Sequence, residues 1–281
     1  MNQTDASALF RRPLLPLLRM VQFLYLLDPC QSPADIVCQL PPAIDTGDIQ
    51  YDNPAELLRP HLDLLEQLAI LRGGASLPCT ILDPAGGELD AIEAVEAWIG
   101  HQLLVRELEA INSALCAPCG CTLCCIGPVA GQSQTFFEIP LTEEETGLFP
   151  SIGRCDSPAS RSQNSDTDPI LAMDGTDFDR GAAKLIHWRR GWSLILPAAT
   201  ACPHLDSRGA CAIYPSRPET CRRPQIFSYL LEADPRHGRR WIAQRKLLAV
   251  WDCPYVRHYQ DAIADFAGLC GLEPVFRHNR A

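Results

Sequence analysis

The chain has 281 residues and a net charge of −10, with apolar and charged fractions that are ordinary for a globular protein. A chain of this length can bury a substantial core, as one large domain or as two modest ones. The negative charge counts against a general nucleic-acid binder or a protein that binds anionic membranes, because both need clustered cations.

The start of the chain carries no convincing export signal. An apolar stretch over 14–27 follows two arginines, but Pro16, Arg19 and Gln22 interrupt it, and no small-residue cleavage site follows. No apolar run approaches the length of a membrane span. We therefore expect a cytoplasmic protein, in which thiols stay reduced and clustered cysteines favour metal over disulfides.

The first third of the chain has the pattern of a helical domain. Apolar residues at helical spacing predict helices over 14–27, 32–40 and 54–71, and a long amphipathic helix over 88–115. This order could form a winged helix-turn-helix, with 77–82 as the wing, but the acidic balance counts against DNA binding. We prefer a domain that packs internally or binds a protein partner through its helices.

The rest of the chain mixes strand and loop patterns. Strands are expected over 135–141 and 192–197, and the second of them ends just before Cys202. Residues 151–181 are rich in Ser, Asp, Gly and Pro, which predicts a flexible insertion. The stretch 229–251 is expected to be helical in part.

These patterns together predict an α+β protein that is mainly helical. We expect a helical domain over 1–112, followed by a cysteine-rich domain over 113–281 that contains a few short strands. The long helix before residue 116 would deliver the chain directly to the first cysteines.

Cysteines are the most informative feature of the sequence. Fourteen are present, and five of them fall within 116–125, separated by Gly and Pro. Two successive Cys-x-x-Cys pairs let sulfurs face one centre across a tight turn, as zinc and iron–sulfur sites require. The candidate metal ligands are Cys116, Cys119, Cys121, Cys124, Cys125, Cys202, Cys211, Cys221 and Cys253.

These candidates exceed the needs of one four-thiolate site, which indicates two metals or a cluster with a spare thiol. Thiolates suit zinc and iron alike, so the expected cofactor is zinc or iron, with an iron–sulfur cluster as one form of the latter. Adjacent cysteines such as Cys124 and Cys125 rarely share one tetrahedral ion, and they make an awkward disulfide framework. The cysteines outside the motifs, Cys30, Cys38, Cys79 and Cys270, are predicted not to be ligands, and neither is Cys155 in the insertion.

The order of several motifs resembles the YkgJ-type cysteine-cluster family, the zinc- or iron-chelating domain named for Cys-x-x-Cys-x-x-Cys-Cys. The resemblance covers roughly 113–255. Its matching segments are 116–125, 139–145, 202–206, 211–214, 217–218, 221–222 and 252–254. The chain departs from the pattern at Pro118, where the family has a cysteine, so the first ligand of the motif is either Cys116 or Cys119.

The resemblance implies metal chelation. Some relatives, similar to flagellin lysine methylase, are enzymes, which leaves an iron–sulfur-dependent redox or protein-modifying enzyme as one alternative. A zinc-stapled interaction module, whose work lies in the N-terminal helices, is another. An enzyme or a metal carrier needs a reachable centre, whereas a structural zinc site is closed.

Several polar side chains lie near the cysteines in sequence. Arg217 and Arg222 fall within the family motif, and we expect them to donate hydrogen bonds to thiolates, with a salt bridge to Glu219 as the alternative. His204 could bind metal, but a loop histidine bonded to a backbone carbonyl is the preferred interpretation. Tyr214 is expected to pack in a turn, and the Glu143–Glu145 run to be a solvated helix start.

The two cysteine-bearing stretches are predicted to meet. The later cysteines Cys202, Cys211 and Cys221 are too far apart in sequence to form a tight site alone, whereas the early ones share one short loop. The strands over 135–141 and 194–197 could bring both loops to one end of a small sheet. Both stretches would then bind one metal centre or adjoining centres.

Overall fold

The structure is a computed structural model, and it describes residues 8–28, 30–73, 76–129, 136–156, 181–188, 191–234 and 237–278. It is 41% helix and 25% strand, and its described part contains ten strands in three sheets. The predicted α+β class fits this content, but the prediction of a mainly helical protein is wrong. None of the described helices is long and apolar enough to cross a membrane.

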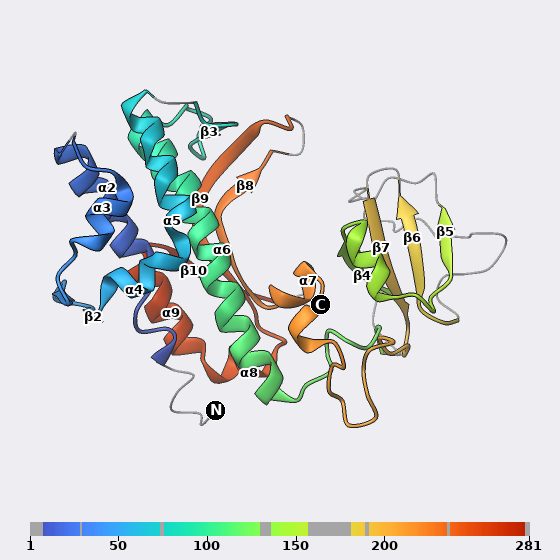
Figure 1. The fold of residues 1–281 in the computed structure, drawn as a ribbon. Helices are drawn as coiled ribbons and strands as arrows, with labels where there is room; N and C mark the ends of the chain where they lie inside the picture. Colours follow the sequence, from blue (N-terminus) through green and yellow to red (C-terminus); the bar gives the residue numbers. More distant parts are fainter. Residues whose placement is uncertain are drawn as a thin grey trace. The chain divides into compact units, whose positions relative to one another are not determined.

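The chain divides into two compact units (Figure 1). The first unit comprises Met1–Leu115, Gln225–Trp251 and Tyr255–Arg277. The second unit comprises Cys116–Pro224, Asp252–Pro254 and His278–Ala281. The sequence pattern suggests one boundary near residue 112, whereas the contacts add two C-terminal segments to the N-terminal part.

The helices of the first unit begin close to where the sequence predicts them. The expected helix over 14–27 is α2, and the one over 32–40 is α3, whose Ser32 and Asp35 form a capping box. The expected helix over 54–71 is broken into short helical pieces, because Pro60 interrupts it. The bounds are α2 Leu15–Leu27, α3 Pro33–Cys38, α4 Pro54–Leu58, η1 Arg59–His61, α5 Leu62–Leu65, η2 Glu66–Arg72, α6 Ala91–Cys119, α8 Pro254–His258 and α9 Gln260–Leu269.

The first unit also contains a sheet that the helical prediction missed. Its central strand β9 (Arg240–Val250) pairs with β8 (Ile226–Ala233) in antiparallel fashion, and with β10 (Glu273–Arg277) and β3 (Thr80–Leu82) in parallel. The expectation of a partly helical stretch over 229–251 is therefore wrong. All four residues from 247 to 250 are buried, so the run lacks the alternation that normally reveals a strand. A two-stranded sheet of β1 (Ala43–Asp45) and β2 (Gln50–Asp52) completes this unit.

The long helix α6 is anchored to this sheet by a buried amide. Asn112 is fully buried, and its Nδ2 donates to the carbonyl oxygen of Ile226 at 2.6 Å. Its Oδ1 accepts the Ile226 amide at 3.2 Å and the Tyr255 hydroxyl at 2.7 Å. Every polar atom of this group therefore has a partner, and α6 is fixed one turn before the first cysteine.

Glu107 on α6 makes the stability of the first unit depend on pH. Its two carboxylate oxygens accept the Leu14 amide at 3.1 and 3.2 Å, and burial raises the pKa of Glu107 from 4.5 to about 8. A carboxyl group with a raised pKa binds its proton more tightly in the folded chain than in the unfolded one. The stabilising effect is thus complete below pH 4.5 and is lost as the pH rises through the folded pKa.

We expect the free energy of unfolding to fall with pH between about pH 5 and 8, by at most about 1.4 kcal/mol per pH unit. The measured slope should be smaller than this limit, because part of Glu107 remains exposed. Glu107→Gln keeps an acceptor for the Leu14 amide but cannot titrate. Denaturant unfolding at several pH values should show the slope in the wild type and a flatter profile in the variant, and equal profiles would contradict the assignment.

The second unit is built on a four-stranded sheet in the order β4-β7-β6-β5. The strands predicted over 135–141 and 192–197 are confirmed as β4 (Phe136–Leu141) and β7 (Gly191–Pro197), which pair with Ile139 opposite Leu194. The other two strands are β6 (Lys184–Trp188) and β5 (Arg154–Asp156). Three short helices, η3 Glu144–Leu148, η4 Tyr214–Ser216 and α7 Glu219–Arg222, complete the unit.

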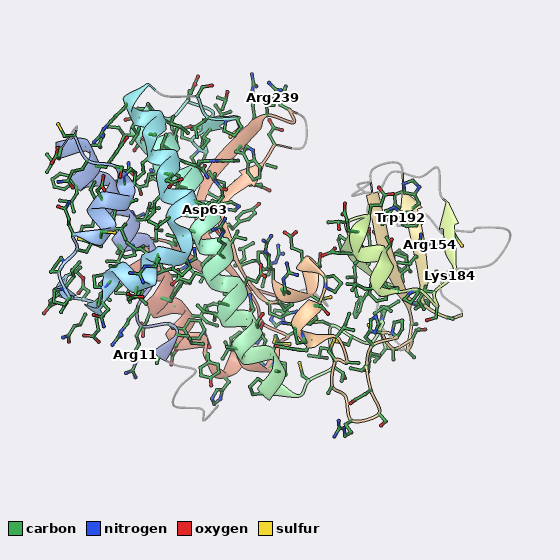
Figure 2. The ribbon with its side chains drawn as sticks, viewed as in Figure 1. Arg11, Asp63, Arg154, Lys184, Trp192 and Arg239 are labelled. Carbon is green, nitrogen blue, oxygen red and sulfur yellow. The ribbon has the colours of Figure 1, made fainter. Side chains whose placement is uncertain are left out.

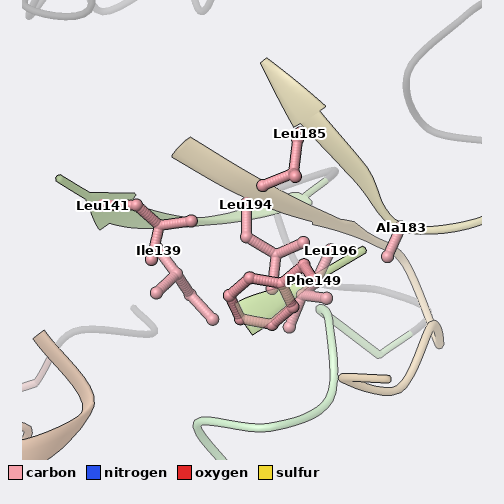
Figure 3. Packing of buried hydrophobic residues seen from close by; sticks show 7 residues of the cluster. All are labelled: Ile139, Leu141, Phe149, Ala183, Leu185, Leu194 and Leu196. Carbon is pink, nitrogen blue, oxygen red and sulfur yellow. The ribbon is translucent and has the colours of Figure 1, made fainter. Parts of the chain in front are cut away.

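One face of this sheet carries the apolar core of the second unit. Figure 3 shows its side chains, which are Ile139, Leu141, Phe149, Ala183, Leu185, Leu194 and Leu196. Cys202 and Cys221 are partly buried against this core, so it positions two candidate ligands. Near the sheet's edge the Arg154 guanidinium lies 5.7 Å from the centroid of the Trp192 ring, and both residues are labelled in Figure 2. The predicted insertion over 151–181 falls mostly outside the described residues, which stop at 156 and resume at 181.

Candidate metal centre

The end of α6 presents the first cysteines. Cys116 and Cys119 lie in its last turn, which also contains Pro118. Gly120 then adopts a positive φ of 63°, a conformation that favours glycine and ends the helix before Cys121. A short turn follows, in which the Cys125 amide donates to the Thr122 carbonyl oxygen at 2.8 Å.

The segment after β7 runs beside this turn. The Cys202 amide donates to the carbonyl oxygen of Cys125 at 2.7 Å, and the Gly127 amide donates to that of Thr200 at 2.9 Å. Ile126 and Ala201 form an antiparallel bridge between them. The expectation that the two cysteine-bearing stretches meet is confirmed by this short ladder, while their binding of one metal stays a prediction.

A tight hairpin brings Cys211 back beside the segment that follows Cys202, with an antiparallel bridge between Leu205 and Cys211. Its turn is held by Asp206, whose Oδ1 accepts the amides of Arg208 and Ala210, each at 2.8 Å. Gly209 supplies the positive φ of 81° that the turn requires. As a result the thiols of Cys202 and Cys211 interact electrostatically.

Cys221 lies on α7, which is held in place by Glu145. The carboxylate of Glu145 accepts the Glu219 amide at 2.7 Å and the Thr142 amide at 2.9 Å. It therefore links the end of β4 to the start of α7. The sequence interpretation of Glu145 as part of a solvated helix start missed this link, because the partner amide is 74 residues away.

The thiols of both stretches gather inside the second unit. Burial, together with the nearby thiols of Cys124, Cys202, Cys221 and Cys116, raises the pKa of Cys125 to about 12. A buried thiolate is unfavourable without a counter-charge, and several close together are more so. The Cys125 thiol is therefore neutral until a cation joins it.

Cys221, in the later segment, is also surrounded by thiols of both segments. Burial raises the pKa of Cys221 to about 12, and the thiols of Cys202, Cys124 and Cys211 act in the same direction. The guanidinium of Arg217 acts against them and lowers this pKa. Within the described residues, no group of three or more Cys, His, Asp or Glu side chains is already spaced to hold a metal ion.

For two candidate ligands, Cys119 and Cys253, the structure gives the position in the fold and the degree of burial. Cys119 is half-buried at the end of α6, and Cys253 is buried just before α8 and belongs to the second unit. The roles of both as ligands stay predictions. Of the remaining candidates, Cys124 is exposed, and Cys116, Cys121, Cys125, Cys202, Cys211 and Cys221 are half-buried.

His204 binds a backbone carbonyl. Its Nε2 lies 2.7 Å from the carbonyl oxygen of Leu148, so this nitrogen carries the proton and donates. Its ring packs on Phe149 with centroids 5.0 Å apart. This geometry agrees with the preferred interpretation of His204 as a loop histidine that satisfies the main chain.

The arginines near the cysteines have different roles. Arg217 is 5% exposed and hydrogen-bonds to Cys116, whereas Arg222 donates to the Arg217 carbonyl oxygen at 2.7 Å. Arg222 therefore helps to hold the backbone of Arg217 in place. The salt bridge to Glu219, which was the alternative for these cations, is made by Arg223.

Comparison with known proteins agrees with this gathering of thiols. Residues 115–237 match the model of the CxxCxxCC family, described as a putative zinc- or iron-chelating domain. The resemblance predicted from the order of the motifs is confirmed over these residues, and all candidate ligands except Cys253 lie inside the matched range. No curated protein and no solved structure matches the chain.

Proposed function

We propose that the CxxCxxCC domain of this chain holds zinc or iron between two segments, 116–125 and 202–221. The observation that carries the proposal is the ladder that pairs Cys125 with Cys202. It brings together thiols that are 77 positions apart in the sequence, and the Cys125 thiol interacts with thiols from both segments. A core serving packing alone would not need to collect so many thiols in one place.

The donor set fits the chemistry of these metals. Thiolates are soft ligands that suit zinc and iron–sulfur clusters, and a coordinated thiol loses its proton. The metal would supply the positive charge that the buried sulfurs need beyond that of Arg217. The ladder and α7 belong to these two segments. A metal bound between the segments would therefore also stabilise the second unit.

The deciding experiment is purification without oxygen, followed by metal analysis and an absorption spectrum. We expect zinc or iron in a fixed ratio to protein. A visible charge-transfer spectrum would identify iron, and a colourless metal-loaded protein would identify zinc. Protein that binds neither metal, even after reconstitution with Zn²⁺ or with iron and sulfide, would refute the proposal.

An iron–sulfur-dependent enzyme is the second candidate, and the exposure of Cys124 favours it. A structural zinc site has four protein ligands and is closed, whereas an enzyme or carrier needs a centre that other molecules can reach. Cys124 is exposed while its neighbour Cys125 is half-buried. A chelator such as 4-(2-pyridylazo)resorcinol should remove metal quickly from a reachable centre and slowly from a closed one. Slow removal of the metal would instead favour a zinc-stapled module that binds a protein partner through its N-terminal helices.

We also propose a cytoplasmic location, because a metal site built from thiolates needs its cysteines in the reduced form. Reducing compartments keep thiols in this form.

The cysteines outside the motifs provide a control for the ligand assignment. Cys30, Cys38, Cys79 and Cys270 all belong to the first unit. We expect a variant with Cys30→Ser, Cys38→Ser, Cys79→Ala and Cys270→Ala to bind as much metal per chain as the wild type. Alanine replaces the two less exposed cysteines, so that no new hydroxyl group is buried. Loss of metal from this folded variant would show that the centre draws on the first unit.

A further inference from the structure

A tyrosine and an arginine from one short turn both bind the thiol of Cys116. Tyr214 begins η4 (Tyr214–Ser216), and Arg217 follows directly after it. The Arg217 Nε donates to the Tyr214 carbonyl oxygen at 3.0 Å. The guanidinium carbon of Arg217 lies 3.6 Å from the centroid of the Tyr214 ring, so the two side chains are stacked.

Both side chains donate a hydrogen bond to the Cys116 sulfur. The tyrosine hydroxyl is oriented in addition by the Ala117 amide, which donates to its oxygen. Sulfur in a neutral thiol is a weak acceptor, whereas a thiolate accepts such bonds strongly. Two donors on one sulfur would therefore stabilise it once a metal is bound, although burial by itself raises the pKa of the Cys116 thiol.

Arg217 also connects this sulfur to the later cysteines. Its guanidinium interacts electrostatically with Cys221, and the Cys116 thiol interacts with Cys121 and Cys125. Cys116 is thus part of the gathered thiols, and a buried cation lies among them. The sequence alone left open whether Cys116 or Cys119 is the first ligand of the motif.

We propose that Cys116 is this first metal ligand, and that Tyr214 and Arg217 are positioning residues that hydrogen-bond to its sulfur and orient it toward the metal. This inference rests on the proposed function. Hydrogen bonds to a metal-bound sulfur withdraw electron density from it, and they tune the metal's spectrum and reduction potential. The two donors would therefore orient Cys116 and weaken the donation of charge from its sulfur.

Cobalt(II) is a suitable probe, because it takes tetrahedral thiolate sites and reports each sulfur by charge-transfer absorption. Full-length protein, prepared without metal or oxygen, would be titrated with Co²⁺. We expect Cys116→Ser to lose part of the charge-transfer absorption and at least about 10-fold in Co²⁺ affinity. Cys119→Ser, from the same helical turn, is the matched control and should keep both close to the wild type. The reverse pattern would overturn the proposal.

Tyr214→Phe tests the positioning role, because it keeps the ring beneath Arg217 and removes only the hydroxyl group. We expect unchanged Co²⁺ stoichiometry and a charge-transfer band moved to longer wavelength, since the sulfur regains electron density. Arg217→Lys should move the band in the same direction, because lysine keeps the charge but not the planar donor group. Tyr229→Phe on β8 of the first unit is the control and should leave the band in place.

The outcomes separate this inference from the proposed function. Wild-type protein that binds no Co²⁺, Zn²⁺ or iron would overturn both. Wild-type protein that binds Co²⁺ while Cys116→Ser and Tyr214→Phe leave affinity and spectrum unchanged would overturn only the role of Cys116 and its two donors.

Discussion

Gly127→Ala is expected to separate the two cysteine-bearing segments and to lower the metal content of the protein. A Cβ atom at this position would lie 2.0 Å from the carbonyl oxygen of Pro197 and 2.6 Å from that of Leu196. Both oxygens belong to the backbone, so no side chain can move aside to relieve the clash. The ladder of Cys125 and Gly127 with Thr200 and Cys202 would have to open.

The cost should be at the upper end of the range for overpacked sites, about 3 kcal/mol or more, because backbone hydrogen bonds are lost as well. Hydrogen–deuterium exchange should become faster in peptides that cover 125–129 and 197–202, and bound metal per chain should fall. Gly147→Ala is the matched control, since no atom lies within 4 Å of a Cβ at that position. Wild-type exchange and metal content in Gly127→Ala would contradict the importance of the ladder.

Local patterns were sufficient for the elements whose burial follows a simple period. The helices α2 and α6 were predictable because their apolar residues recur at helical spacing on one face. The strands β4 and β7 were predictable as short apolar runs bounded by turn residues. In each case the sequence pattern that decides the element lies within that element.

The missed sheet of the first unit shows where this reasoning ends. Strand β9 lies between neighbours on both sides, and its last four residues are all buried. Its partners are β3, β8 and β10, and β3 lies about 160 positions earlier in the chain. A long-range parallel pairing of this kind leaves no periodic signal in either segment. The same pairing explains why the C-terminal strands join the N-terminal helices in one compact unit.

The candidate site was predictable in composition and only partly in geometry. The spacing of cysteines indicated the candidate sulfurs, but the contacts that arrange them come from residues without an evident motif. Gly127 allows two backbones to approach, Glu145 fixes α7, and Tyr214 binds Cys116. Each acts across at least 70 positions of sequence, so its role depends on tertiary structure.

Cys124→Ser and Cys211→Ser are expected to weaken metal binding through the same centre, although 87 positions separate them. Both thiols interact electrostatically with Cys221, which places them around a common neighbour. Loss of a ligand should lower zinc affinity by about 100-fold or more, since changes beyond the ligands already cost about 10- to 100-fold. Thermal stability of the metal-loaded protein should fall in each variant, because bound metal stabilises the folded chain.

The double variant decides whether the two segments form one centre. If both sulfurs bind one metal or bridged metals, the first replacement already disables the unit, and the second removes less than it does alone. We expect a coupling free energy above about 0.5 kcal/mol, measured by competition with a chromophoric zinc chelator. Cys124→Ser combined with Cys38→Ser, which lies in the first unit, should show no coupling. Strict additivity of Cys124→Ser and Cys211→Ser would mean that the two segments serve separate sites, even though the ladder between Cys125 and Cys202 brings them side by side.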